Sequence, residues 1–412
     1  MTSLQSDLVV TTDPAEVGLD GGRLARLDRR LARWVDEGQL PGLLVTVARH
    51  GRLVHVGTYG HRDVEARLPV TPETRWRIYS MTKPVTSVAA MSLYEEGAFE
   101  LNDPISRWLP EWADTRVYVA GSELNPVTVP QLEPIRVRHL LTHTAGITYG
   151  FHHAHPVDTL YRLQGFEWAT PPGADNAEVS RQLAAMPLLF QPGSEWNYGM
   201  STDVLGRLVE VVAGKLLDEV FEERVFGPLG MSETSFGLRP GDDVGSLARL
   251  YGPGVQPLPA PFEQGAHSRP TFLAGGAGLV STAGDYLRFM EMLRSGGRTP
   301  SGDRVLGPRT LAYMVRNHLP GNVDLETYGR PLYAETPLRG VGFGLGFSMV
   351  LDPVRYGSVS SAGEYGWGGA ASTAFWIDPV EELTVGFYTQ LLPSSALPIR
   401  SHLRQLVNQA LV

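Results

Sequence analysis

Two residues that can act together as a nucleophile and its base stand three positions apart in Ser80-Met81-Thr82-Lys83. On a helix this spacing puts the hydroxyl and the amine on one face, with Cβ atoms about 5–6 Å apart. A serine hydroxyl is a weak nucleophile by itself, and a lysine can take its proton when its surroundings keep it partly uncharged. The motif therefore predicts covalent acyl chemistry. The competing interpretation is an N-cap serine beside a solvated lysine.

Lysine is rare in this chain. Of its 35 Lys and Arg residues, only Lys83 and Lys215 are lysine. Arginine stays charged in proteins and cannot replace a lysine that must lose its proton. A lysine three residues after a serine therefore favours a chemical requirement at this position over a solvated surface charge.

Two further segments are candidates for the same site. Residues 196–206 (WNYGMSTDVLG) place Tyr198 in a loop directly before a helix, where a buried structural tyrosine is the alternative. Residues 364–373 (EYGWGGAAST) form a glycine-rich turn before an apolar strand. Its glycines allow the backbone to approach a ligand closely, or they form a bulge.

The elements that must position these segments follow from the apolar pattern. Residues 22–37 predict an amphipathic helix because Leu24, Leu27, Leu31 and Trp34 recur every three or four positions. A second helix is expected over Pro84–Glu96, so that Ser80 stands where it begins, and a final helix around Leu397–Leu411. Strands are predicted at Leu43–Val47, Leu53–Thr58, Gly346–Leu351, Ala374–Ile377 and Leu383–Tyr388.

These elements predict an α/β (α+β) fold. We expect the early hairpin and the late strands to form one antiparallel sheet flanked by the terminal helices, in a domain made of residues 1–75 and 336–412. Residues 76–335 mix helical stretches with Pro- and Gly-rich loops and are expected to form an inserted, mostly helical domain. The active site would lie in the cleft between the two domains.

Together the three segments resemble the family VIII carboxylesterases, which share the fold of class C β-lactamases and penicillin-binding proteins. The likeness runs from about residue 20 to residue 412. Three further stretches look like phrases of this family and are interpreted as scaffold. They are residues 138–147 (RHLLTHTAGI), 227–231 (GPLGM) and 275–285 (GGAGLVSTAGD).

The resemblance implies a role for each matching residue. Ser80 would form the acyl-enzyme, Lys83 would deprotonate it, and Tyr198 would carry the proton to the leaving group and activate water. The oxyanion hole would be the backbone N–H groups of Ser80 and Ala370. Trp367, Gly368 and Gly369 would bind substrate in place of the Lys-Thr-Gly strand of the lactamases.

The sequence departs from the lactamases at two points. Tyr198 is not followed two positions later by an asparagine, and Lys-Thr-Gly occurs nowhere in the chain. Those polar groups hold an amide and a carboxylate, whereas a tryptophan offers an apolar wall and a single N–H donor. Ester substrates are therefore expected in preference to β-lactams.

Four aromatic residues fall in loops near these segments and are expected to line a pocket for the acyl group. They are Tyr149, Phe151, Trp168 and Trp196. Packing in the hydrophobic core is the competing explanation.

Other signals limit the chemistry. His152, His153 and His155 could bind a metal together with Asp158, but Pro156 is expected to interrupt the helix that would align them. No metal site and no cofactor are therefore predicted. The motif Gly-x-Ser-x-Gly is absent, so an α/β-hydrolase nucleophile elbow has no support.

Composition excludes several classes of function. The chain has no cysteine, which excludes disulfides, zinc-thiolate sites and a cysteine nucleophile. A formal net charge of −9 without long runs of like charge argues against nucleic-acid binding. The N-terminal residues lack a signal-peptide pattern and no long apolar run follows, so we expect a cytoplasmic protein without a membrane partner. The sequence does not specify the oligomeric state.

The expected function is hydrolysis of short- to medium-chain carboxylic esters, small molecules that would acylate Ser80. The same acyl-enzyme could instead serve an acyltransferase, or a weak β-lactamase or D-amino-peptidase. A non-catalytic ligand-binding homologue is a third alternative, against which the intact Ser80, Lys83 and Tyr198 argue.

Overall fold

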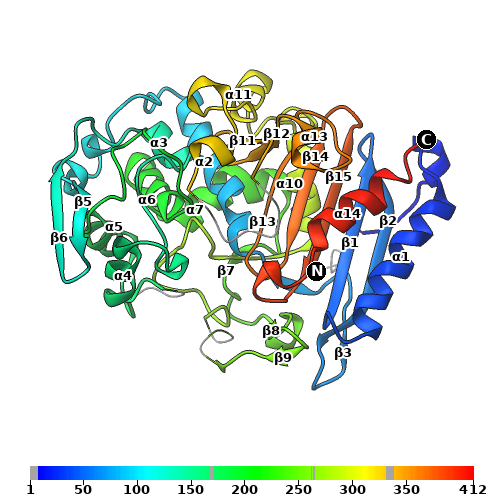
Figure 1. Cartoon of the computed structure of the whole chain (residues 1–412). Coiled ribbons are helices and arrows are strands. Elements are labelled where there is room, and N and C mark those ends of the chain that lie inside the picture. The colour runs from blue at the N-terminus through cyan, green and yellow to red at the C-terminus, as the bar shows by residue number, and fades with distance from the viewer. Residues whose placement is uncertain (1–7, 168–170, 261, 263–264, 331–337) are drawn as a thin grey trace.

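An eight-stranded antiparallel sheet with helices on both faces organises the computed structural model (Figure 1). The structure describes residues 8–167, 171–260, 262, 265–330 and 338–412. In spatial order the strands are β11 (Val341–Phe343), β12 (Ser348–Val350), β13 (Tyr365–Gly368), β14 (Ala374–Asp378), β15 (Leu383–Thr389), β1 (Gly42–Arg49), β2 (Arg52–Asp63) and β3 (Leu68–Pro69). The predicted joining of the early hairpin to the late strands is confirmed, because β1 pairs directly with β15.

The burial of each strand follows its place in the sheet. Strands β1 and β15 lie inside the sheet and are buried on both faces, as their nearly continuous apolar sequences require. Strand β2 lies nearer an edge and is half-exposed over much of its length. A bulge between Val47 and Ala48 shifts the register of β1 against β2.

Two terminal helices pack side by side on one face of the sheet, α1 (Gly21–Asp36) and α14 (Ile399–Asn408) (Figure 1). The predicted stripe of α1 is buried in full, and Asp20 caps the helix by accepting a hydrogen bond from the backbone N–H of Arg23. From α14, Leu403 and Val407 enter the same hydrophobic cluster. The N- and C-terminal parts of the chain thus build one core together.

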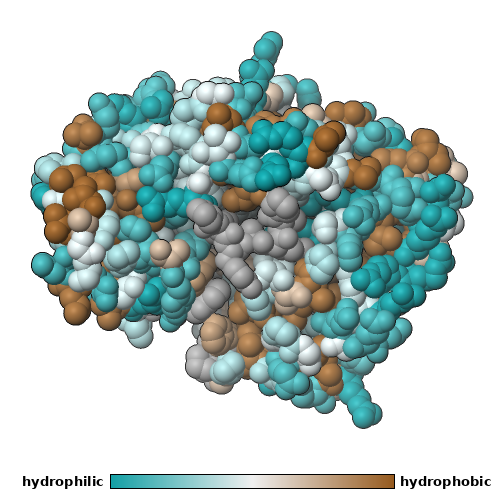
Figure 2. Space-filling model, viewed as in Figure 1, coloured by the Kyte–Doolittle hydropathy of each residue, from teal (hydrophilic) through white to brown (hydrophobic). Residues whose placement is uncertain are grey.

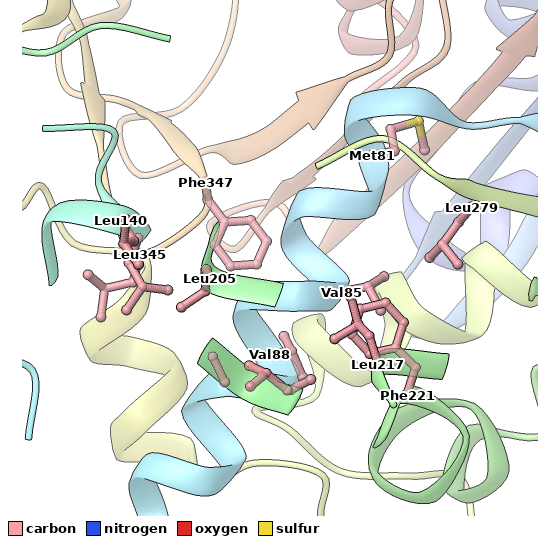
Figure 3. Packing of buried hydrophobic residues seen from close by; sticks show 14 of the residues in the cluster. Met81, Val85, Val88, Leu140, Leu205, Leu217, Phe221, Leu279, Leu345 and Phe347 are labelled. Atoms are coloured by element: carbon pink, nitrogen blue, oxygen red, sulfur yellow. The ribbon is translucent and has the colours of Figure 1, made fainter. Parts of the chain in front are cut away.

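A central helix, α2 (Thr82–Glu95), lies on the other side of the sheet and is buried on every side from Thr82 to Leu93. Figure 3 shows Val85 of this helix beside Leu217 and Phe221, and Met81, Val88, Leu205 and Leu279 belong to the same buried cluster. A helix that is covered all round needs apolar or small residues on all its faces, and this sequence supplies them at nearly every buried position, with Lys83 as the charged exception. The start of α2 is therefore fixed by packing from several directions.

The helices that lie between residues 137 and 356 include α6 and α7, which pack against α2. They are α3 (Val137–Leu141), α4 (Pro156–Leu163), α5 (Asn176–Ala184), α6 (Ser201–Ala213), α7 (Leu217–Phe221), α8 (Gly227–Leu229), α10 (Ala283–Arg294), α11 (Pro308–Met314), α12 (Leu325–Tyr328) and α13 (Pro353–Tyr356). A small sheet of β4 (Arg75–Arg77), β10 (Leu279–Thr282) and β7 (Ser235–Phe236) and the strand pair β8 (Tyr251–Gly252) and β9 (Gln256–Pro257) accompany them. The predicted division into two domains stays a prediction.

A hairpin of β5 (Arg116–Ser122) and β6 (Asn125–Pro130) lies at the far end of this helical region (Figure 1). It exposes Val119, Leu124 and Val127, and Figure 2 shows hydrophobic surface on this side of the molecule. Strand β6 begins and ends near prolines, which lack the N–H that another strand would need for pairing.

Among the described residues, no helix combines the length and the apolar character needed to cross a membrane.

Packing of α14 against the sheet can be tested with a cavity-forming substitution. Leu403 is fully buried, whereas Gln405 on the same helix is exposed. We expect Leu403→Ala to lower the free energy of unfolding by about 2–5 kcal/mol, because the loss of buried methyl groups leaves a cavity. Gln405→Ala should change it by no more than about 0.5 kcal/mol. Urea unfolding followed by tryptophan fluorescence measures both, and equal effects of the two substitutions would contradict the packing described.

Candidate active site

Ser80 lies in a single 3-10 turn, Tyr79–Met81, that leads directly into α2. Tyr79 in this turn has a φ of +44°, a left-handed backbone conformation that residues other than glycine rarely adopt. The backbone N–H of Ile78 donates to Leu279 in β10 at 3.1 Å and so anchors the approach to the turn. Ser80 therefore stands one short turn ahead of the helix that was expected to begin with it.

Lys83 occupies the first turn of α2, and only 1% of its surface is exposed. Its Nζ is 3.2 Å from Ser80 Oγ, 3.0 Å from the hydroxyl of Tyr149 and 2.7 Å from the carbonyl oxygen of Gly276. An ammonium has three N–H donors, and these three oxygens can accept all of them. When the amine is neutral, its lone pair can accept a hydrogen bond from a hydroxyl. The geometry thus accommodates both charge states.

Tyr198 brings a third hydroxyl to the same point. Its O–H donates to Ser80 Oγ at 2.6 Å, and Trp367 Nε1 donates to the tyrosine oxygen at 3.3 Å. The loop before α6 is held by the ring of His152, whose Nε2 lies 2.7 Å from the carbonyl oxygen of Tyr198. Nearby, Asn197 Nδ2 donates to the carbonyl oxygen of Ile147 at 3.2 Å.

Aromatic rings and neutral groups surround the Lys83 amine. Nζ lies 4.6 Å from the ring centroid of Tyr198 and 5.4 Å from that of Tyr149, within the range of cation–π attraction. Burial raises the pKa of the Tyr149 hydroxyl well above its usual value, so this group keeps its proton. Burial, together with the charge of Lys83, lowers the pKa of His143 well below its usual value, so the imidazole stays neutral.

The glycine-rich turn after β13 lies against the segment that leads to Ser80. A Cβ atom on Gly369 would stand 2.5 Å from the carbonyl oxygen of Ile78, so only glycine allows this approach. Thr373 Oγ1 donates to that same carbonyl oxygen at 3.4 Å. The next residue in the turn, Ala370, borders the same pocket as Ser80.

The pocket in front of Ser80 has a volume of about 530 Å³. This size is within the range typical of small-molecule sites. Most of its walls are apolar, and they come from Phe151, Leu325, Leu338, Val341, Tyr356, Trp367, Phe375 and Leu392. Its polar boundary includes His152, Ser348 and two arginines of α14, Arg400 and Arg404. Arg404 is paired there with the buried carboxylate of Glu364 at 2.7 Å.

The aromatic residues predicted to line an acyl pocket have different positions. Phe151 borders the pocket, as do Trp367, Gly368 and Gly369. Tyr149 stacks on Phe151 with 4.6 Å between ring centroids and directs its hydroxyl to Lys83. Trp168 lies outside the described residues.

Trp196 does not fit its predicted place in the pocket wall. Its side chain is fully buried and stacks behind the ring of Tyr198, with 6.3 Å between centroids. A residue with no exposed surface cannot touch a substrate in this conformation. Core packing, the competing explanation, describes Trp196 correctly.

The histidines near residue 150 make separate contacts. His152 bonds to the backbone of Tyr198, His153 pairs with Glu167 at 3.0 Å, and His155 Nδ1 accepts a hydrogen bond from the backbone N–H of Val157. The expectation that Pro156 interrupts a helix is wrong, because it is the first residue of α4, where its missing N–H costs nothing. No group of three or more potential metal ligands was found among the described residues.

Sequence reasoning missed part of the network around Lys83. The stretch 275–285 was interpreted as scaffold, yet the carbonyl oxygen of Gly276 makes the shortest contact of the amine. Tyr149 was expected to face the substrate and instead touches Lys83. Two adjacent glycines, Gly275 and Gly276, were the available signal, because such pairs allow close backbone approach.

Comparison with known proteins places this geometry in a family. The chain is 32% identical to Esterase EstB of Burkholderia gladioli over 399 residues, covering 90% of this chain and 92% of that protein. It is 30% identical to Acyltransferase calJ of Penicillium decumbens over 339 residues, 79% of this chain and 78% of that protein. The solved structure of EstCE1, a hydrolase with promiscuous acyltransferase activity, matches with a TM-score of 0.79 and 30% identity, covering 94% of this chain and 98% of that one.

These likenesses confirm the resemblance to family VIII carboxylesterases and the β-lactamase-like fold predicted from the motifs. The model of one family, described as Beta-lactamase, matches residues 27–409. Since that match spans nearly the whole chain, the chain belongs to the beta-lactamase family.

Proposed function

We propose that this protein is a carboxylesterase-type serine hydrolase that cleaves short- to medium-chain carboxylic esters through an acyl-enzyme on Ser80. The observation that carries the proposal is the contact of three groups at one buried point. Ser80 Oγ lies 3.2 Å from the amine of Lys83 and 2.6 Å from the hydroxyl of Tyr198, and Ser80 and Tyr198 line a mostly apolar pocket. The likeness to EstB and EstCE1 supports the assignment.

In the first half of the reaction, neutral Lys83 takes the proton of Ser80 as Oγ attacks the ester carbonyl carbon. The backbone N–H groups of Ser80 and Ala370 would stabilise the oxyanion, as they do in the family that the motifs resemble. When the bond to the alcohol breaks, Tyr198 gives its proton to the leaving oxygen and regains one from Lys83. The alcohol departs and the acyl group remains on Ser80.

In the second half, water attacks the acyl carbonyl carbon and gives its proton to the same pair of groups. The bond to Ser80 then breaks, and Oγ takes a proton back from Tyr198 or Lys83. The carboxylic acid leaves, and the amine and phenol return to their starting protonation states. No external oxidant, reductant or metal is required by this balance.

The pocket supports an ester substrate over a β-lactam. Trp367 presents one N–H, which already donates to Tyr198, and otherwise contributes an apolar wall. The acyl or alcohol part of the substrate would lie against Phe151, Leu325 and Val341. Burial of each apolar methylene there would contribute about 0.8 kcal/mol to binding.

Acyl transfer is the second candidate function, and two comparisons favour it. EstCE1 is described as having promiscuous acyltransferase activity, and calJ is an acyltransferase. The acyl-enzyme would be the same, and an alcohol or amine would replace water as the acceptor. Weak cleavage of β-lactams or D-amino-peptides is compatible with the same nucleophile, but the missing Lys-Thr-Gly argues against efficient turnover.

The cytoplasmic location and the lack of nucleic-acid partners stay predictions.

A serine-reactive fluorophosphonate tests the nucleophile. We expect one probe to bind per native chain, at Ser80, because among the described residues only this serine has both an amine and a phenol within hydrogen-bond distance. Ser80→Ala should lose both the label and the turnover of a chromogenic butyrate ester, whereas Ser301→Ala, at an exposed loop, should keep both. Mass spectrometry locates the label. Full ester turnover by Ser80→Ala would reject the proposal, as would equal labelling of unfolded protein.

Loss of the Tyr198 hydroxyl should reduce kcat/KM more than loss of the Tyr149 hydroxyl. Tyr198→Phe removes the hydroxyl that contacts Ser80 and should lower kcat/KM by about 10²–10⁴-fold, the usual range for a proton-transfer group. Tyr149→Phe removes one of three acceptors of Lys83 and should lower it about tenfold. Steady-state kinetics with the same ester measures both. Equal losses would show that Tyr198 has no special role in proton transfer.

Partition between hydrolysis and transfer can be measured with a competing alcohol. In the presence of butan-1-ol, a chromogenic ester should release chromophore at an undiminished rate while part of the free acid is replaced by butyl ester. The reason is that the alcohol and water would compete for one acyl-enzyme formed before either reacts. Chromatography of the products gives the ratio. If the molar ratio of free acid to released chromophore stays at one as the butan-1-ol concentration rises, the protein does not transfer the acyl group to this alcohol.

A further inference from the structure

Asp203 is a buried carboxylate that stands behind the Lys83 amine without touching it. It lies in the first turn of α6 and is 4% exposed. Its Oδ1 accepts a hydrogen bond from the backbone N–H of Gly276 at 2.9 Å, and the carbonyl oxygen of Gly276 accepts one from Lys83 Nζ at 2.7 Å. One glycine therefore connects the carboxylate to the amine.

The segment around Gly276 is held from both sides. Thr86 Oγ1 of α2 donates to the carbonyl oxygen of Gly275 at 2.6 Å, and the backbone N–H of Leu279 donates to Thr82 Oγ1 at 3.2 Å. A Cβ atom on Gly276 would stand 2.5 Å from Asp203 Oδ2, so a side chain here would collide with the carboxylate. Helix α2 thus fixes the flanks of the segment, and Asp203 fixes its centre.

The Asp203 carboxylate also matters for the charge balance around Lys83. Among the described residues, Lys83 forms no direct ion pair, and the groups it contacts are hydroxyls and a carbonyl. Tyr149, Tyr198 and His143 face it from the surrounding loops, and burial keeps Tyr149 and His143 in their neutral forms. A buried cation is costly unless a negative charge compensates it.

Asp203 and Lys83 influence each other across Gly276. Burial raises the pKa of the Asp203 carboxyl above its usual value, and the charge of Lys83 and the hydrogen bond from Gly276 offset only part of that rise. The attraction is mutual, because a negative Asp203 stabilises the ammonium form of Lys83 by the same free energy. Asp203 is therefore a source of compensating negative charge behind the amine.

We propose that Asp203 is a positioning residue that holds the Gly276 carbonyl oxygen against Lys83 and, through its charge, sets the pH at which the Ser80 nucleophile becomes active. This inference rests on the proposed function. It assigns Asp203 no contact with substrate and no step in bond formation or cleavage. Its two parts, position and charge, can be separated by substitution.

Asp203→Asn tests the charge. The amide keeps an oxygen for the Gly276 N–H but carries no charge, so the negative charge behind the amine is lost. In the pH profile of kcat/KM for a chromogenic ester, the acid limb should move down by about one unit, since a nearby opposite charge shifts a pKa by roughly that amount or more. The plateau at alkaline pH should remain within about threefold of the wild type, because the hydrogen bond is retained.

Glu210→Gln is the matched control. Glu210 is also a buried carboxylate of α6, and its Oε1 accepts the backbone N–H of Leu217 at 3.2 Å. It pairs with Arg207 at 3.0 Å and contacts none of the residues assigned to the active site. The control should leave the acid limb unmoved. Superimposable profiles for Asp203→Asn and the wild type would overturn the charge part of the proposal, and so would an equal shift in Glu210→Gln.

Gly276→Ala tests the position while leaving the charge in place. The new methyl group would press on Asp203 Oδ2 and displace the carbonyl oxygen from Lys83, so kcat should fall by about tenfold or more with KM little changed. Asp203→Ala should show the same fall together with the pH shift. Circular dichroism and thermal unfolding establish that each variant is folded. An unchanged kcat in folded Gly276→Ala would overturn the positioning part.

Failure of this inference is distinguishable from failure of the proposed function. If the wild type is labelled at Ser80 and loses turnover in Ser80→Ala, the function stands, and the profiles of the Asp203 variants then decide this inference alone. A wild type that hydrolyses no ester and takes no label at Ser80 removes the proposed function, and this inference falls with it.

Discussion

The structure depends most on the burial of one amine beside one hydroxyl at the start of α2. Lys83 Nζ is almost fully shielded from water and stands 3.2 Å from Ser80 Oγ. A lysine in that position loses its hydration, so every donor must find a protein acceptor. The Tyr149 hydroxyl and the Gly276 carbonyl oxygen are those acceptors. The loops that carry Tyr149 and Gly276 must therefore both reach the Lys83 amine.

Glycine makes that meeting possible. Gly276 lies between Lys83 and Asp203, and Gly369 lies against the carbonyl oxygen of Ile78, each where a Cβ atom would approach another atom to 2.5 Å. The first brings an acceptor to the amine, and the second brings the turn after β13 to the side of Ser80. Two segments with no helix or strand pattern of their own thus become parts of one site, because their backbones can approach more closely than a side chain would allow.

Aromatic packing positions the phenol of Tyr198. Its ring contacts the rings of Trp196, Trp367 and His143, and Phe343 packs against Trp196 in the same cluster. These ring contacts restrict the orientation of the Tyr198 ring. The hydrogen bond from Trp367 Nε1 holds its hydroxyl oxygen. The neutral state of His143 matters here, because a second positive charge beside Lys83 would be costly in this buried environment. The same cluster continues into the apolar wall of the substrate pocket through Trp367.

The sequence by itself determined the pairing of Ser80 with Lys83, the terminal helices and five of the eight strands of the sheet, because these depend on spacings of two to four residues. It did not delimit β3 or β11, and it presented β13 as part of a glycine-rich turn. It also indicated Tyr198, although only by likeness to a family. It could not place Trp196 behind Tyr198, or turn Tyr149 toward Lys83, or bring Asp203 and Gly276 behind the amine. Lys83 and its partners Tyr149 and Gly276 are separated by 66 and 193 residues, and Tyr198 and Ser80 by 118. No local periodicity reports contacts at such separations. They arise only when α2, α6 and the loops between them pack around a common core, and that packing is a property of the whole fold.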